Sequence, residues 1–275
     1  MTKFKIAAIQ MLTNTDKKEN LKSAKGYIKK VAEEGADIVV LGEMFNTPYI
    51  TSNFPIYGEI GKGESWQALS EAAKDNDIYV VGGSIPEKDE EGRIFNTSFV
   101  FDREGNQIAR HRKMHLFDID VEGGQTFRES DTLTAGDEVT VFDTEFGKIG
   151  LCICYDFRFP ELSRLMVNEG AKVIIVPAAF NMTTGPAHWD ILFRTRALDN
   201  QVYTIGAAPA RDSRTGYTSW GHSMIVDPWG KVIKQLDEKV GYFIEEVDLN
   251  YVIQVRDELP MLNQRRLDLY ELNKK

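Results

Sequence analysis

The chain has 275 residues, of which 42% are hydrophobic, and its formal net charge is −9. This length and composition suit one large layered domain, so we expect residues 1–275 to form a single domain. The acidic balance argues against nucleic acid or an anionic membrane surface as the main partner, although a local arginine or lysine can still bind a small anionic substrate.

The first half of the chain alternates segments of strand character with segments of helical spacing. In chain order we expect a strand over 5–11, a helix over 20–34, a strand over 36–44, a helix over 65–76, and strands over 78–85, 96–102 and 107–114. The continuous apolar run at 36–44 is typical of a strand that is buried on both faces.

The second half repeats the alternation and adds hairpins. In chain order we expect a hairpin over 138–154, a helix over 160–170, a strand over 171–180, a helix over 187–201, a strand over 202–210 and a hairpin over 222–235. Such a mixture predicts two mixed sheets that face each other with helices outside, a four-layer αββα sandwich. The charged last residues, about 250–275, are typical of an arm or exposed tail.

The sequence shows no sign of a membrane or an oxidising compartment. No apolar run reaches the ~20 residues that a membrane span needs, and the first residues lack the layout of a signal peptide. The chain has two cysteines, Cys152 and Cys154, and no second cluster of cysteine and histidine accompanies them. We therefore expect a soluble cytoplasmic protein without a bound metal.

Three reactive side chains each follow an apolar strand. Glu43 follows "DIVVLG", Lys113 follows "QIARHR", and Cys154 follows "GLCI". Ligands of layered α/β proteins bind outside the carboxyl ends of strands. Each residue alone has an ordinary explanation, as a capping carboxylate, a surface cation or a small core residue. Their coincidence nevertheless indicates an acid, a base and a nucleophile at one edge of the fold.

The sequence around these residues resembles a known family. "LGEMF", "HRKMHLFD" and "CYDFRFPE" are similar to the three signature segments of the nitrilase superfamily, the carbon–nitrogen hydrolases, and the resemblance covers essentially the whole chain. It implies an αββα sandwich, a homodimer or larger homo-oligomer, and a catalytic triad of Glu43, Lys113 and Cys154. It also implies a supporting glutamate, for which Glu129 in "FRES" is the match and Glu122 in "DVEGG" the alternative.

The chemistry of amide hydrolysis explains these residue types. An amide carbon is a poor electrophile and calls for a thiolate, but a free cysteine has a pKa near ~8.5 and needs a base, here Glu43. Lys113 and a backbone N–H near Tyr155 can stabilise the oxyanion. Glu43 then protonates the departing ammonia and activates the water that hydrolyses the thioester, so the reaction needs no cofactor.

A cysteine–histidine dyad is the competing interpretation of the same thiol. The chain has four histidines, and the Glu-Lys-Cys scheme requires none of them. We expect His115 and His188 to line the pocket or to be structural, and His111 and His222 to be structural or on the surface.

The loop segments "NTPYI", "HLFDIDV", "FNMTTGPAHWD" and "ARDSRTGYTSWGHS" look most like the omega-amidase branch of the superfamily. That resemblance implies a small-molecule amide as substrate, namely α-ketoglutaramate or α-ketosuccinamate. The alternatives are another amidase, acting on deaminated glutathione or an N-carbamoyl amine, and a non-catalytic scaffold of the same fold.

The substrates of that branch carry a remote carboxylate, which a cation or a set of hydroxyls must bind. Simpler roles remain open for several of the candidates. Arg158 could form an ion pair that braces the turn, Tyr49 could be a core residue, and Phe180 and Asn181 could simply mark the end of a strand. The candidate substrate contacts are Tyr49, Tyr155, Arg158, Phe180, Asn181 and His188.

Overall fold

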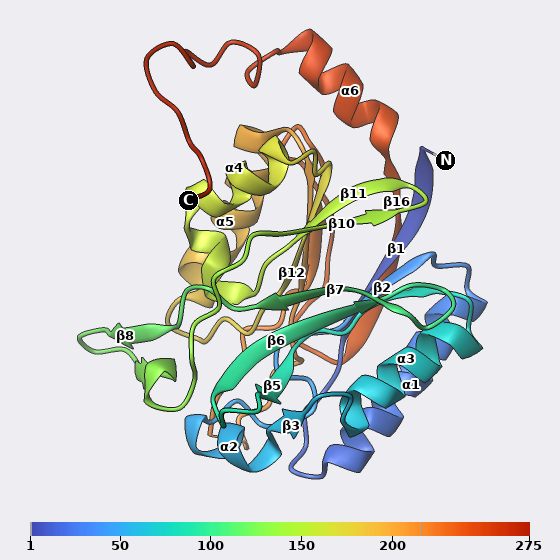
Figure 1. Ribbon diagram of the computed structural model, residues 1–275, viewed down its shortest axis with the longest axis vertical. Helices are drawn as coiled ribbons and strands as arrows, with labels where there is room; N and C mark the ends of the chain where they lie inside the picture. The colour runs from blue at the N-terminus through green and yellow to red at the C-terminus, as the bar shows by residue number, and fades with distance from the viewer. Residues whose placement is uncertain (1, 215) are drawn as a thin grey trace.

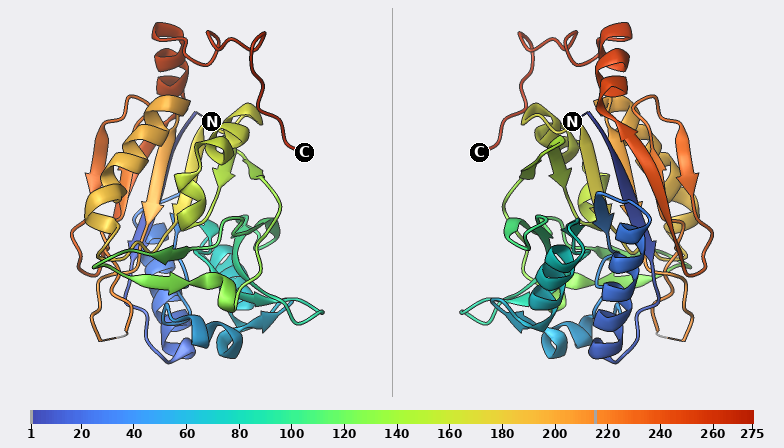
Figure 2. Two further views of the ribbon diagram at one scale, coloured as in Figure 1. Left: turned by 90° about the vertical axis from the view of Figure 1, so that its left-hand side faces the viewer. Right: turned by 90° about the vertical axis from the view of Figure 1, so that its right-hand side faces the viewer.

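Two β-sheets lie face to face at the centre of the molecule, with helices on both outer faces (Figures 1 and 2). The computed structural model describes residues 2–214 and 216–275. This arrangement confirms the four-layer αββα sandwich expected from the sequence.

The first sheet has eight strands of mixed direction. They are β1 (Lys3–Gln10), β2 (Ile38–Val40), β3 (Glu59–Ile60), β4 (Tyr79–Val81), β5 (Ile85–Lys88), β6 (Ile94–Phe101), β7 (Gln107–Arg112) and β16 (Gly241–Asp248). The order is β16-β1-β2-β4-β6-β5-β3, and β7 also pairs with β6. β1, β2 and β4 are parallel, β6 is antiparallel to β4, and β7 is antiparallel to β6. The strands β2 and β7 therefore end at the same edge.

The second sheet has six strands, in the order in which they occur along the chain. They are β10 (Thr140–Thr144), β11 (Gly147–Leu151), β12 (Val173–Pro177), β13 (Tyr203–Ala207), β14 (Met224–Val226) and β15 (Val232–Gln235). β11, β12 and β13 are parallel, and the other neighbours are antiparallel. A separate hairpin consists of β8 (Asp118–Asp120) and β9 (Thr126–Arg128).

The helices in the described residues are α1 (Lys17–Glu33), α2 (Phe54–Tyr57), α3 (Glu64–Asp75), α4 (Pro160–Asn168), α5 (Gly185–Asn200) and α6 (Leu249–Glu258), with 3₁₀ turns η1 (Thr51–Asn53), η2 (Glu129–Asp131) and η3 (Cys154–Arg158). Four of these helices, α1, α3, α4 and α5, cover the outer faces of the two sheets, and the short α2 and the C-terminal α6 lie at opposite ends of the sandwich (Figure 1). α1 and α3 pack side by side on the first sheet, and α4 and α5 on the second (Figure 1). Within the described residues, no helix is long and apolar enough to cross a bilayer.

The interior consists of three apolar layers, and β1 shows how one strand serves two of them. Side chains alternate between the faces of a strand. Ile6 and Ala8 pack between the two sheets, whereas Ala7 and Ile9 pack against α1 and α3. A third layer lies between the second sheet and the helices α4 and α5.

One predicted strand is divided in the structure. The segment 78–85 was expected to be a single strand, but it forms β4 and the start of β5, with Gly82 and Gly83 between them. A Cβ atom on Gly83 would lie 2.1 Å from the Gly42 carbonyl oxygen, and the φ of Gly83 is +57°. The two glycines therefore allow a close approach between the chain after β2 and the chain after β4.

The sequence pattern did not predict β16, which pairs with β1 along its whole length, from Lys3 opposite Asp248 to Gln10 opposite Gly241. Its sequence, GYFIEEVD, has two adjacent glutamates and lacks a clear alternation.

The expected C-terminal arm begins later than predicted. Residues 249–258 form α6, because Leu249, Val252 and Val255 recur at helical spacing and are buried. Only the residues after α6 run out as an arm, which returns toward α4 (Figure 1), where Arg265 donates a hydrogen bond to Asn168.

Candidate active site

Three strand ends bring the predicted reactive residues to one end of the sandwich. Glu43 follows β2 and Lys113 follows β7, and both strands end at the same edge of the first sheet. Cys154 follows β11 of the second sheet. The site therefore lies where the two sheets meet, with its charged groups on one sheet and its thiol on the other.

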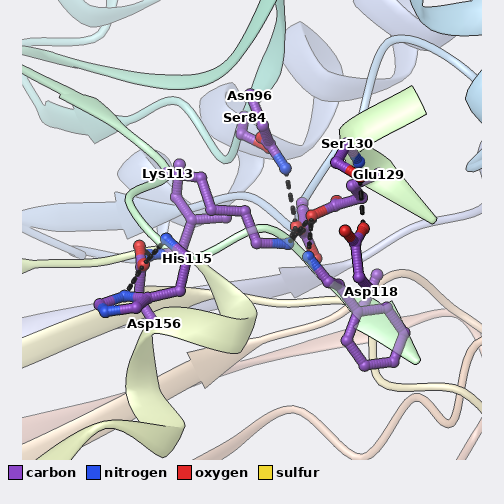
Figure 3. Close-up of polar contacts among 12 residues, drawn as sticks. Ser84, Asn96, Lys113, His115, Asp118, Glu129, Ser130 and Asp156 are labelled. Atoms are coloured by element: carbon purple, nitrogen blue, oxygen red, sulfur yellow. Dashed lines mark hydrogen bonds and ion pairs between the residues drawn. The ribbon is translucent and has the colours of Figure 1, made fainter. Parts of the chain in front are cut away.

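Lys113 is the centre of a buried ion cluster (Figure 3). Its Nζ lies 2.9 Å from Glu43 Oε1 and 2.9 Å from Glu129 Oε2, and all three side chains have no exposed surface. Burial alone would lower the pKa of Lys113, but the charges of Glu129 and Glu43 outweigh that cost and raise it above its ordinary value. The lysine is therefore an ammonium ion.

Hydrogen-bond donors surround only one of the two carboxylate oxygens of Glu43. Its Oε1 accepts hydrogen bonds from Asn96 Nδ2 at 2.8 Å and from Lys113 at 2.9 Å, and the Tyr49 hydroxyl lies 3.1 Å away. Its Oε2 is buried and has no hydrogen-bond partner in the described part of the chain. This oxygen is therefore free to accept a proton from a thiol or a water molecule.

The structure brings Glu129 to the cluster and leaves Glu122 outside it. Glu129 opens η2 after the β8–β9 hairpin, and its Oε2 accepts a hydrogen bond from the Phe117 backbone N–H at 2.7 Å. The Tyr49 hydroxyl donates to Glu129 Oε1 at 2.5 Å. Glu122 is exposed at the tip of the hairpin.

Cys154 occupies a strained turn between β11 and α4. It is 5% exposed, and its φ of +48° lies in the left-handed region, which side chains other than glycine rarely adopt. Burial raises the pKa of the thiol well above its ordinary value, and the charge of Glu43 raises it further, whereas Lys113 and a backbone hydrogen bond from Ala179 lower it. The thiol at rest is therefore protonated.

Glu43 is suited to remove that proton. Burial raises the pKa of its carboxyl group above the ordinary value; Lys113 lowers it and the charge of Glu129 raises it again. A carboxylate with a raised pKa is a stronger base. The neighbouring thiol and carboxylate can therefore exchange a proton without a histidine.

Each of the four histidines has a partner other than the thiol. His111 and His115 contact Asp156, His188 contacts Arg158, and His222 contacts the Trp220 carbonyl oxygen. This geometry disfavours the cysteine–histidine dyad. In the described residues, no group of three or more histidine, cysteine, aspartate or glutamate side chains has the arrangement of a metal site.

Arg158 ends the turn that Cys154 begins, and it is half buried. Its guanidinium group lies 4.6 Å from the centre of the Phe180 ring and 5.6 Å from that of Tyr155, and its Nη1 donates to His188 Nδ1 at 2.9 Å. Burial lowers its pKa, and its Nε has no hydrogen-bond partner among the described residues. The ion pair considered for Arg158 is absent there, since no described carboxylate lies within 4.0 Å.

The remaining candidates line the same region. Asn181 Oδ1 accepts hydrogen bonds from the chain at 183–184, while its Nδ2 is buried and has no partner within the described residues. The Tyr49 ring packs at a tilt against Tyr217, with ring centres 4.6 Å apart, and against Phe127, with ring centres 5.6 Å apart. Tyr49 and Tyr217 border a narrow cavity of about 30 Å³ beside Glu43.

Sequence reasoning missed Asn96, Tyr217 and Asp156. Asn96 is the first residue of the strand expected over 96–102, and it lies within β6, where every residue is buried. No signal in the sequence alone distinguishes its amide from that of a surface asparagine. Tyr217 comes from a loop far along the chain, and its hydroxyl donates to the Ala179 carbonyl oxygen. Asp156 stands in the segment that carries the thiol, where its role depends on contacts with a distant strand.

Comparisons with known proteins extend along the whole chain. A family model described as carbon–nitrogen hydrolase matches residues 5–257. The chain is 49% identical over all its 275 residues to a Xenopus laevis protein named omega-amidase NIT2-A, and 46% identical to omega-amidase NIT2 of Homo sapiens, covering 99% of each. The solved structure of Saccharomyces cerevisiae Nit3, described as a member of branch 10 of the nitrilase superfamily, has a TM-score of 0.90 at 41% identity and covers 96% of this chain and 97% of its own.

Proposed function

The chain belongs to the carbon–nitrogen hydrolase family, and we propose that within it the protein is an omega-amidase acting on α-ketoglutaramate and α-ketosuccinamate. It is a hydrolase with amidase activity. The observation that carries the narrower proposal is the likeness over the full length to proteins named omega-amidase. A second support is Arg158, which has no carboxylate partner among the residues that the structure describes.

The first half of the proposed reaction forms a thioester. Glu43 Oε2 takes the proton of the Cys154 thiol as the sulfur attacks the amide carbon. The negative charge that develops on the amide oxygen is stabilised by the Lys113 ammonium group and a backbone N–H near Tyr155. Glu43 then gives its proton to the amide nitrogen, the C–N bond breaks, and ammonia leaves.

The second half reverses the roles of nucleophile and leaving group. Glu43 takes a proton from a water molecule, whose oxygen attacks the thioester carbon. Lys113 again stabilises the oxyanion, the C–S bond breaks, and the thiolate recovers the proton from Glu43. The products are a carboxylic acid and the free enzyme. Glu129 and Tyr49 both lie within hydrogen-bond distance of Lys113 Nζ. We assign them the role of keeping the ammonium group in place.

Arg158 is the proposed anchor of the remote carboxylate. Its planar guanidinium can bind a carboxylate through two parallel hydrogen bonds. Its Nε is buried and has no partner within residues 2–214 and 216–275. The rings of Phe180 and Tyr155 hold it in one orientation. Asn181 Nδ2 is a second donor with no partner in that part of the chain, and it is suited to the keto oxygen or the carboxylate.

A substrate panel tests the proposal. We expect ammonia release from α-ketoglutaramate to exceed that from glutamine, a nitrile, an N-carbamoyl amine and deaminated glutathione at equal concentrations, with Cys154→Ala as the inactive control. Arg158→Met should raise KM for α-ketoglutaramate far more than for a short uncharged amide, because only α-ketoglutaramate has a carboxylate that Arg158 can bind.

Three outcomes would contradict this proposal at different levels. A higher kcat/KM for any competitor in the panel would overturn the omega-amidase activity and leave the amidase in place. Ammonia release by Cys154→Ala at the wild-type rate would overturn the triad itself and leave a scaffold without this chemistry as the alternative. An equal rise in KM for charged and uncharged amides would remove the role of Arg158.

We also propose that the protein is a homodimer or larger homo-oligomer and works in the cytoplasm. An apolar strip on the outer face of the second sheet supports association, since Ile191 and Leu198 of α5 and Trp229 after β14 are 61%, 43% and 51% exposed. Both cysteines are free, which suits a reducing compartment.

A further inference from the structure

Asp156 joins the two halves of the active site. It lies two residues after Cys154 on η3, and its carboxylate has no exposed surface. Burial would raise the pKa of this carboxyl, but the hydrogen bonds from His111 and His115 outweigh it and hold the pKa well below the ordinary value. Asp156 is thus a buried ion that touches neither Lys113 nor the thiol directly.

Five hydrogen bonds converge on this carboxylate, from two parts of the chain. Oδ2 accepts from the Ile153 backbone N–H at 3.1 Å and from His111 Nε2 at 2.9 Å. Oδ1 accepts from the backbone N–H groups of Met114 and His115 at 3.1 and 2.8 Å, and from His115 Nδ1 at 2.8 Å. Figure 3 shows Lys113 extending from this junction to the glutamate cluster.

The junction supplies a directional contact between the two sheets at the site itself. Lys113 belongs to the first sheet and Cys154 to the second, and the layer between the sheets is apolar. Apolar burial is non-directional and tolerates small sliding movements, whereas hydrogen bonds fix position. His111 extends the link, because its Nδ1 lies 2.9 Å from Thr140 Oγ1 on β10 of the second sheet.

We propose that Asp156 is a positioning residue that fixes the Lys113 ammonium relative to the Cys154 sulfur across the two sheets, with His115 as its main partner on the lysine side. The inference rests on the proposed catalytic roles of Lys113 and Cys154. Its consequence is kinetic: loosening the junction lowers kcat and leaves substrate affinity largely intact, because the guanidinium anchor does not depend on His115.

Two substitutions of His115 separate the hydrogen bond from packing. The imidazole stacks on Phe159 at 3.8 Å with an interplanar angle of 13°. His115→Phe keeps a ring for this stack and loses the Nδ1 donor, whereas His115→Asn loses the stack and keeps a donor near the Nδ1 position. We expect kcat of His115→Phe to fall about 10- to 100-fold with KM unchanged, a size typical of small misplacements of reacting groups. His115→Asn should retain most of its kcat.

Asp156→Asn tests the carboxylate itself, since the amide keeps the size but sets an N–H group against the N–H groups around it. The matched control is Asp227→Asn, because Asp227 is also a buried aspartate that accepts two backbone N–H bonds, in the turn after β14. We expect a lower kcat per folded molecule for Asp156→Asn than for Asp227→Asn. If Asp156→Asn does not fold, the kcat values of His115→Phe and His115→Asn test the proposal on their own.

Equal kcat losses in the two His115 variants would assign the effect to packing on Phe159 and overturn the proposal, as would wild-type kcat in His115→Phe or in folded Asp156→Asn. An active Cys154→Ala would instead remove the premise that Cys154 is the nucleophile. That result would overturn the proposed function, and it is distinguishable from a failure of the role proposed for Asp156.

Discussion

At the scale of single residues, the proposed site pairs a buried thiol with a buried carboxyl group. The Cys154 thiol and the Glu43 carboxyl are both buried, and burial raises the pKa of each. Lys113 is the cation that remains available for an oxyanion. Turnover of an amide therefore requires proton transfer by Glu43. Reaction of the thiol with an alkylating agent does not require it.

We expect Glu43→Gln to abolish ammonia release while Cys154 stays open to alkylation by iodoacetamide. Glutamine cannot shuttle the proton that both halves of the reaction require. Removal of the negative charge also lowers the pKa of the thiol, since Glu43 raises it in the wild type. Peptide mass mapping locates the label, and Cys152, which has no exposed surface, should stay unmodified.

Turnover by Glu43→Gln at more than a few per cent of wild type would exclude Glu43 as the base. Labelling at Cys152 in place of Cys154 would show that the nucleophile has been assigned to the wrong cysteine.

At the scale of elements, the position of Glu43 depends on the contact between two strand ends. The chain after β2 turns at Met44, which has a φ of +53°, and the Met44 backbone N–H donates to Ser84 Oγ at 3.0 Å. Ser84 follows Gly83, which packs against Gly42. The base is thus held by the end of the neighbouring strand.

Two glycine substitutions should change stability in opposite directions. A Cβ atom on Gly83 would lie 2.1 Å from a backbone oxygen at positive φ, so Gly83→Ala should destabilise the fold by at least about 1–2 kcal/mol and lower kcat as Glu43 shifts. Gly26 in α1 has open space around its Cβ position, so Gly26→Ala should stabilise by roughly 0.5–1 kcal/mol without effect on kcat. Urea unfolding measures both, and a stabilised Gly83→Ala would refute the close approach.

The elements predictable from sequence were those with strong local patterns. The helix α4 begins at Pro160 and ends before Gly170, as its proline and glycine predict. The positions of Glu43, Lys113 and Cys154 past strand ends were also predictable. The strand β16 was not, because its pairing with β1 is entirely long-range. The roles of Asp156 and Asn96 depend on contacts across sheets, which local spacing does not encode.

At the scale of the whole molecule, the apolar strip of Ile191, Leu198 and Trp229 lies on the outside of the second sheet, away from the strand ends that carry the triad. Asp190 and Arg194 on the same helix form an ion pair at 3.6 Å beside it. A surface with an apolar centre and a charged rim suits contact with a second copy.

We expect light scattering to give a dimer or larger assembly at micromolar concentration, and Ile191→Asp combined with Trp229→Glu to shift it toward monomer. Ile56→Asp is the matched control, because Ile56 is 77% exposed but lies on α2. A wild-type monomer at this concentration, or equal dissociation by the control, would contradict the assignment of this surface.

The pairing of β1 with β16 also constrains how the chain is made. β1 leaves the ribosome first, yet its partner at 241–248 follows almost the whole of the rest of the sequence. At about 5–20 residues per second, the nascent chain waits roughly 10–50 s for that strand. During this time one edge of β1 stays unpaired, with Lys3 and Lys5 as charges that discourage pairing with other chains. Closure of the first sheet therefore waits until residues 241–248 have been synthesised, and a chain that stops before residue 241 leaves that edge open.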